Sequence, residues 1–160
     1  MTTKLKKVLI ALDYDPTAQK VAETGFALAK KMGAEVTLLH VIINPLYYSS
    51  PEYSPIMGYS GSMDMSQLML NPVDGLIEVT QHFLDKSKQH LGDETIQTVI
   101  KEGRSSDQIL KTANELHIDV IVMGSHSKQW LENIIMGSVT EEVLRHTTIP
   151  LFIVPTKKRK

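Results

Sequence analysis

The sequence of 160 residues contains no cysteine. This absence excludes disulfides, thiolate metal sites and a cysteine nucleophile, and it fits a reducing compartment. No apolar run approaches the roughly 20 residues that a membrane-spanning helix needs. The apolar run at residues 8–12 is also too short for the core of a signal peptide. We therefore expect a cytoplasmic protein with no membrane partner.

A strong excess of one charge is absent as well, since the formal net charge is −1. This balance gives no global reason to expect a nucleic acid partner, and the basic tail 157–160 (KKRK) is more typical of a solvated terminus. The histidines lack a metal-binding spacing such as H-E-x-x-H, and neither G-x-x-x-x-G-K-[ST] nor a strand-to-helix G-x-G-x-x-G is present. The sequence therefore offers no catalytic residue and no metal ligand to assign.

Short apolar runs alternate along the chain with segments of helical apolar spacing. The expected strands cover residues 5–12, 35–43, 95–101, 119–123 and 149–154. The expected helices begin at Asp15-Pro16, at Asn71-Pro72, at Ser105 or Ser106, and at Gly137, and the first two end at Gly33 and Gly92.

Strands separated by helices predict an α/β domain with a single doubly wound five-stranded parallel sheet and helices on both faces. The domain is expected over residues 1–156, before the basic tail. The pattern leaves two strand orders open, 3-2-1-4-5 and 2-1-3-4-5, and such folds bind ligands where the winding direction reverses. The segment 44–70 has no clear period and is rich in tyrosine and methionine. It is interpreted either as a mobile insertion or as a lid or partner-contact segment.

The stretch 123–142 (MGSHSKQWLENIIMGSVTEE) follows the fourth expected strand and contains two glycines. Gly124 permits a sharp turn and a close approach of a ligand to the backbone. Residues 137–141 (GSVTE) have the features of a helix start, with capping-box spacing between Ser138 and Glu141. The first turn of a helix presents N–H donors and favours an anion. The pattern fits a phosphate cradle, although a turn followed by a capped helix accounts for the same residues.

Residues 122–155 (VMGSHSKQWLENIIMGSVTEEVLRHTTIPLFIVP) resemble the C-terminal signature of the universal stress proteins. Nucleotide-binding members of that family carry the pattern G-x-x-G, a spacer of nine residues, and then Gly-Ser or Gly-Thr. Here Gly124 and Gly137 match the first and third glycines across the spacer 128–136, whereas Ser127 replaces the second. The stretches KKVLIALDYDPTA and VTLLHVI resemble the first two strands of the family.

The resemblance implies the 3-2-1-4-5 order and two classes of member, those that hold ATP or AMP and those that do not. We expect this chain to hold ATP or AMP, together with Mg²⁺. In this sequence the family's adenine pocket corresponds to Ala11 and the backbone of Val41, and its ribose contact corresponds to the carboxylate of Asp13. The phosphate cradle falls on Met123, Gly124, Ser127, Gly137, Ser138, Val139 and Thr140. If position 127 requires a positive φ, serine costs roughly 1–2 kcal/mol; if it requires only a small residue with an exposed N–H, serine fits.

In the 3-2-1-4-5 order the last strand lies at the edge of the sheet. Its residues 151–154 (LFIV) carry no charge that would protect such an edge. Pairing with a second copy about a two-fold axis would cover it, and the resemblance implies the same homodimer, joined through residues 150–155.

The function implied is an ATP-binding stress-response or signalling module, regulatory rather than catalytic. Two alternatives stay open: a slow ATPase, for which Glu132 and His126 are the only nearby candidate bases, and a dimeric interaction protein without nucleotide. A response-regulator-like domain is the runner-up at the level of the fold. Asp13 and Asp15 alone match poorly the acidic cluster that such a domain requires.

Overall fold

The computed structural model describes residues 5–13, 17–43, 72–125 and 137–156. The segment 44–70 and the tail 157–160 therefore lie outside the described residues. The elements follow one another as β1 (Lys7–Ala11), α1 (Ala18–Met32), β2 (Glu35–Ile42), α3 (Pro72–Leu91), β3 (Gln97–Glu102), α4 (Ser105–Glu115), β4 (Val120–Gly124), α5 (Ser138–His146) and β5 (Leu151–Val154).

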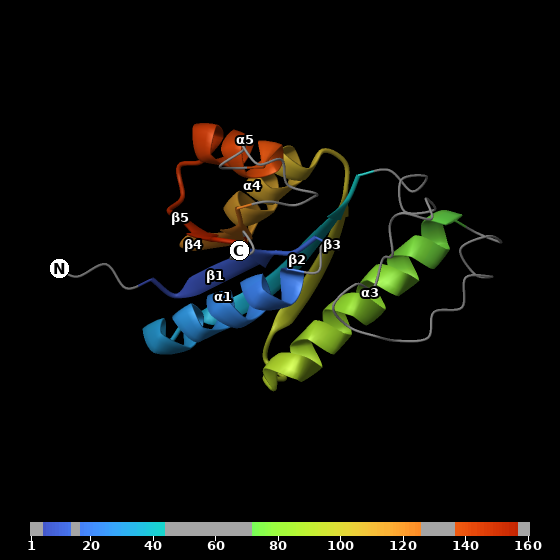
Figure 1. The fold of residues 1–160 in the computed structure, drawn as a ribbon, viewed down its shortest axis with the longest axis horizontal. Helices are drawn as coiled ribbons and strands as arrows, with labels where there is room; N and C mark the ends of the chain where they lie inside the picture. The colour runs from blue at the N-terminus through green and yellow to red at the C-terminus, as the bar shows by residue number, and fades with distance from the viewer. Residues whose placement is uncertain (1–4, 14–16, 44–71, 126–136, 157–160) are drawn as a thin grey trace, which may run out of the picture.

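The five strands form one parallel sheet in the order β3-β2-β1-β4-β5. This order confirms 3-2-1-4-5 and excludes the flavodoxin-like alternative. Strand β1 lies at the centre, with Ala11 opposite Leu39 of β2 and Ile10 opposite Val122 of β4. Helices α1 and α3 cover one face of the sheet, and α4 and α5 cover the other (Figure 1). The predicted doubly wound α/β fold is confirmed.

The core consists of two apolar clusters, one on each face of the sheet. Alternate residues of β1 supply both, because successive side chains of a strand point to opposite faces. Val8 and Ile10 join the cluster under α1 and α3, whereas Leu9 joins the cluster under α4 and α5. All three side chains are completely buried, which explains why the central strand reads as a continuous apolar run.

Two predicted helix ends are confirmed, and one predicted start is wrong. Gly33 and Gly92 follow α1 and α3 with φ of 65° and 73°, which is the left-handed conformation that glycine adopts freely. The N-cap of α1 is Thr17 and not Asp15, so the helix begins after the predicted cap. Asp15 itself lies outside the described residues.

The serine caps predicted for α4 and α5 are also wrong. The N-cap of α4 is Arg104, and the hydroxyl of Ser106 donates instead to the Glu142 carboxylate across 2.8 Å. The N-cap of α5 is Gly137, whose extended backbone makes Ser138 the first helical residue and removes it from the capping position. At the start of α4, a contact with α5 that local sequence cannot reveal has thus taken the place of a local cap.

His40 is a buried polar residue within the core, with 2% of its surface exposed. Its Nδ1 lies 2.7 Å from the Leu12 carbonyl, and its ring meets that of Phe83 edge-on at 6.5 Å between centroids. A carbonyl only accepts, so Nδ1 carries the proton. Burial lowers the pKa of His40 to about 4, against the opposing effect of the hydrogen bond to Leu12. The imidazole is therefore neutral near pH 7.

This lowered pKa predicts that the protein loses stability in mild acid. Above pH 6.5 the imidazole is neutral in both the folded and the unfolded chain. As the pH falls from 6.5 to about 4, only the unfolded chain takes up the proton, so the free energy of unfolding decreases by up to about 3 kcal/mol. Urea unfolding at several pH values should show a shallower decrease in His40→Asn over this window. Equal slopes in the variant and the wild type would contradict the assignment.

Candidate functional site

The predicted site residues gather at the carboxyl ends of the strands. Ala11 is the last residue of β1, Val41 lies near the end of β2, and Met123 and Gly124 end β4. Gly137 precedes α5 directly. Ser127 lies outside the described residues. β1 and β4 are neighbours, and the helices that follow them, α1 and α5, lie on opposite faces of the sheet. Doubly wound folds bind ligands at the edge where the winding direction reverses in this way.

Several residues predicted to contact the adenine or to form the phosphate cradle lie on the same side of the sheet. Val41 and Met123 belong to the core cluster under α4 and α5, and Ala11 and Val139 pack against the same cluster. Val41 and Met123 are buried, whereas Ala11 and Val139 are half-buried. The ends of these strands therefore carry apolar side chains on the α4 and α5 face, and apolar side chains suit contact with a flat aromatic base.

Asp13 lies two residues beyond the end of β1. The N–H of Leu12 still donates to the Leu39 carbonyl, at 2.8 Å, so the backbone is held to β2 up to that residue. Asp13 comes next in the chain and is half-buried. Its carboxylate is a pure acceptor when ionised, as contact with sugar hydroxyls requires.

The start of α5 is fixed to the end of β4 by two hydrogen bonds. The Gly137 N–H donates to the Ser125 carbonyl at 2.6 Å, and the Thr140 hydroxyl donates to the Gly124 carbonyl at 2.8 Å. The hydroxyl proton of Thr140, which is buried, is thus used inside the protein. Among the described residues, the first hydrogen bond within the helix runs from Glu141 N–H to the Gly137 carbonyl. The N–H groups of Ser138, Val139 and Thr140 come before this bond, and the first N–H groups of a helix have no partner within the helix.

Ser125 and Thr156 were missed in the sequence, although both are buried at this edge. The Ser125 N–H donates to the Val154 carbonyl at 2.9 Å, and its Oγ accepts from the Thr156 N–H at 3.0 Å. The two hydroxyls lie 3.2 Å apart. These contacts join the exits of β4 and β5. Nothing local signals them, because the partners are 31 positions apart in the sequence.

A second pair that the sequence did not reveal joins α4 to α5 near the same edge. Arg104 Nη2 lies 2.5 Å from Glu142 Oε1, and the Ser106 hydroxyl donates to the other carboxylate oxygen. The hydrogen bond from Ser106, followed by the charge of Arg104, lowers the pKa of Glu142. Glu142 follows the first turn of α5, so this contact holds the candidate cradle against α4.

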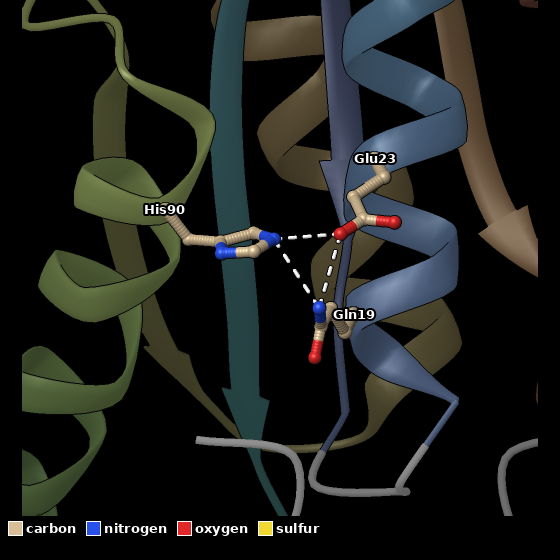
Figure 2. Close-up of polar contacts among 3 residues, drawn as sticks. All are labelled: Gln19, Glu23 and His90. Carbon is tan, nitrogen blue, oxygen red and sulfur yellow. Dashed lines mark hydrogen bonds and ion pairs between the residues drawn. The ribbon is translucent and has the colours of Figure 1, made fainter. Parts of the chain in front are cut away.

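A polar cluster on the opposite face of the sheet joins α1 to α3 (Figure 2). His90 Nε2 lies 2.6 Å from Glu23 Oε1, and the Gln19 amide donates to the same oxygen at 3.0 Å. These hydrogen bonds, that of His90 being the stronger influence, lower the pKa of Glu23. The cluster is half-exposed and shares no residue with the predicted site.

The described residues hold neither a metal-binding cluster nor a helix that could span a membrane. No group of three or more His, Cys, Asp or Glu side chains in this part of the chain is placed to hold a metal ion. Within the same residues, every helix is too short or too polar to cross a bilayer.

Comparison with known proteins identifies the family. The model of the universal stress protein family matches residues 4–155. Universal stress protein MJ0577 of Methanocaldococcus jannaschii is 29% identical over 160 residues, covering 98% of this chain and 99% of that protein. A solved structure of MJ0577 superposes with a TM-score of 0.74 at 27% identity, over 98% of this chain and 100% of that one.

Two further solved structures share the fold at lower identity. A universal stress protein in complex with cAMP has a TM-score of 0.64 at 15% identity, over 97% of this chain and 100% of its own. One from Archaeoglobus fulgidus in complex with dAMP has a TM-score of 0.58 at 17% identity, over 94% of this chain and 98% of its own. Because the family model spans nearly the whole sequence and the strand order agrees, the chain belongs to the universal stress protein family.

Proposed function

We propose that this protein binds an adenine nucleotide, ATP or AMP, at the crevice between β1 and β4 and acts as a regulatory stress-response module. The observation that carries the proposal is the start of α5. Its first N–H groups, those of Ser138, Val139 and Thr140, are held beside Gly124 by the Thr140 hydroxyl and the Gly137 N–H. A helix start with free donors stabilises a phosphate through hydrogen bonds and the macrodipole.

The rest of the nucleotide would lie along the ends of β1 and β2. The adenine would contact Ala11 and the backbone of Val41 over the apolar side chains there, and the carboxylate of Asp13 would accept from the ribose hydroxyls. Ser127 would complete the cradle with its N–H. Two proteins of this fold have been solved as complexes with nucleotides of this size, one with cAMP and one with dAMP.

Any Mg²⁺ would be held mainly by the phosphates. Mg²⁺ keeps several waters and takes few protein ligands when phosphate oxygens are present. We assign no catalytic base, because Glu132 and His126 lie outside the described residues. As the family resemblance implies, we propose a regulatory role, and we propose the cytoplasm as its location.

The proposal is tested by releasing bound nucleotide with acid from the purified protein and identifying it by mass spectrometry, followed by calorimetric titration with ATP and AMP. Binding without turnover supports the regulatory module. Phosphate release at a steady slow rate would favour the ATPase, and no binding at all would favour an interaction protein without nucleotide.

Gly137→Val should abolish nucleotide binding, with at least a roughly tenfold loss of affinity, while the fold is retained. The backbone of Gly137, with φ of −68° and ψ of 158°, accepts a β-branched residue. The added side chain would occupy the space in front of the first turn of α5, where the phosphate is proposed. Gly124→Val should act in the same way. Ala27→Val, on the exposed side of α1, adds bulk away from the crevice and serves as the control. A folded Gly137→Val that binds ATP with wild-type affinity in calorimetry would remove the cradle.

Ser127→Gly should keep or tighten the binding of ATP, because it restores the glycine of the family pattern and relieves any strain of a positive φ. The gain is limited to the roughly 1–2 kcal/mol of that strain, and titration of both proteins under one condition measures it. Severalfold weaker binding would instead mean that the serine hydroxyl contacts the nucleotide.

We also propose a homodimer joined through residues 150–155. The Ile121 N–H donates to the Pro150 carbonyl, so β5 is bonded to β4 on one side, and its other side is the edge of the sheet. Phe152 is 38% exposed there. Ile153→Asp should convert the dimer into monomer or aggregate, because a charge at the seam would lose its water. Thr148→Asp, an exposed position before the strand, is the control. Sedimentation of the wild type as a monomer at micromolar concentration would overturn this interface.

A further inference from the structure

Strand β2 divides its backbone hydrogen bonds between its two neighbours. In a parallel sheet the peptide groups of alternate residues point to opposite sides of the strand. The Glu35 N–H donates to the Lys6 carbonyl of the β1 chain, and the Leu39 carbonyl accepts from Leu12. On the other side, the Ile42 carbonyl accepts from the N–H of Gly103, beyond β3. The N–H and C=O of odd-numbered residues in β2 thus face β1.

The next bond in the series toward β1 would join the Val41 N–H to the Leu12 carbonyl. Among the described residues that bond is not formed, although the Leu12 N–H still takes the Leu39 carbonyl. The Leu12 carbonyl accepts instead from His40 Nδ1 at 2.7 Å. A side chain has therefore replaced a backbone donor at the point where β1 and β2 part.

We propose that His40 is a positioning residue that occupies the Leu12 carbonyl and so leaves the Val41 peptide available to the edge of a nucleobase. This inference rests on the proposed nucleotide site. It assigns to His40 the role of keeping the Val41 N–H from pairing with β1. Val41 presents an N–H and a C=O on the same side. Adenine offers the matching pair, a ring nitrogen that accepts beside an amino group that donates.

The surroundings of His40 suit this role. Its side chain lies on the α1 and α3 face, where the Phe83 ring packs edge-on against it and limits its rotation. Burial favours the neutral ring over the charged one. The proton sits on Nδ1 because its partner is a carbonyl. His40 thus acts from the face opposite the crevice, through the backbone and without touching the ligand.

The experiment compares the wild type with His40→Leu and His40→Asn. Leucine removes the donor, whereas the asparagine amide places a donor close to the position of Nδ1. We expect His40→Leu to release the Leu12 carbonyl, so that the Val41 N–H pairs with it. Amide hydrogen exchange should then show Val41 protected without ligand in His40→Leu, in contrast to the wild type and His40→Asn. Calorimetry with AMP should give roughly tenfold weaker binding to His40→Leu and recovery in His40→Asn.

The outcomes separate this inference from the site on which it rests. In the wild type without ligand, a Val41 amide that exchanges as slowly as that of Leu39 would overturn the role of His40, and this measurement does not depend on how the variants fold. Equal AMP affinity in folded His40→Leu and wild type would overturn it as well. Failure of the wild type to bind either ATP or AMP would sink the nucleotide site, while the exchange of Val41 would still report on the His40 contact.

Discussion

The end of the pairing between β1 and its neighbours is the constraint on which the rest of the structure depends. β1 is bonded to β2 on one side and to β4 on the other, and its side chains fill both core clusters. Such a strand must be apolar throughout and can change direction only after it leaves the sheet. The backbone that continues β1 stays bonded to β2 up to Leu12, and the proposed nucleotide site lies where β1, β2 and β4 end.

The position of α5 follows from the same edge. Its first turn is anchored by the carbonyl of Gly124, the last residue of β4, and by the carbonyl of Ser125, which follows it. Glu142 fixes the next turn to α4 through Arg104 and Ser106. The donors that we assign to phosphate are therefore oriented by the sheet and by α4.

The sequence predicted the strands, the helix ends at Gly33 and Gly92, and the strand order that the family resemblance implied. These features depend on periodicity and on local backbone preference, which nearby residues determine. The sequence also predicted where α4 and α5 begin, but it wrongly assigned their caps to serines. It also gave no sign of the contact between Ser125 and Thr156. The partner is remote in two of these cases: Ser106 and Glu142 are 36 positions apart, and Ser125 and Thr156 are 31 apart. A local sequence pattern cannot reveal a hydrogen-bond partner that comes close only in the folded protein.

The division of β2 into residues that face β1 and residues that face β3 limits how the family can vary. One residue inserted between Glu35 and His40 would move every later side chain to the other face. It would also turn the Val41 peptide from β1 toward β3, so the core and the crevice would fail in one step. An insertion at the turn of Gly33 and Ala34 would leave this parity intact. Length changes in evolution should therefore accumulate before β2 and after it, and the strand itself should keep its residue count even where its sequence drifts.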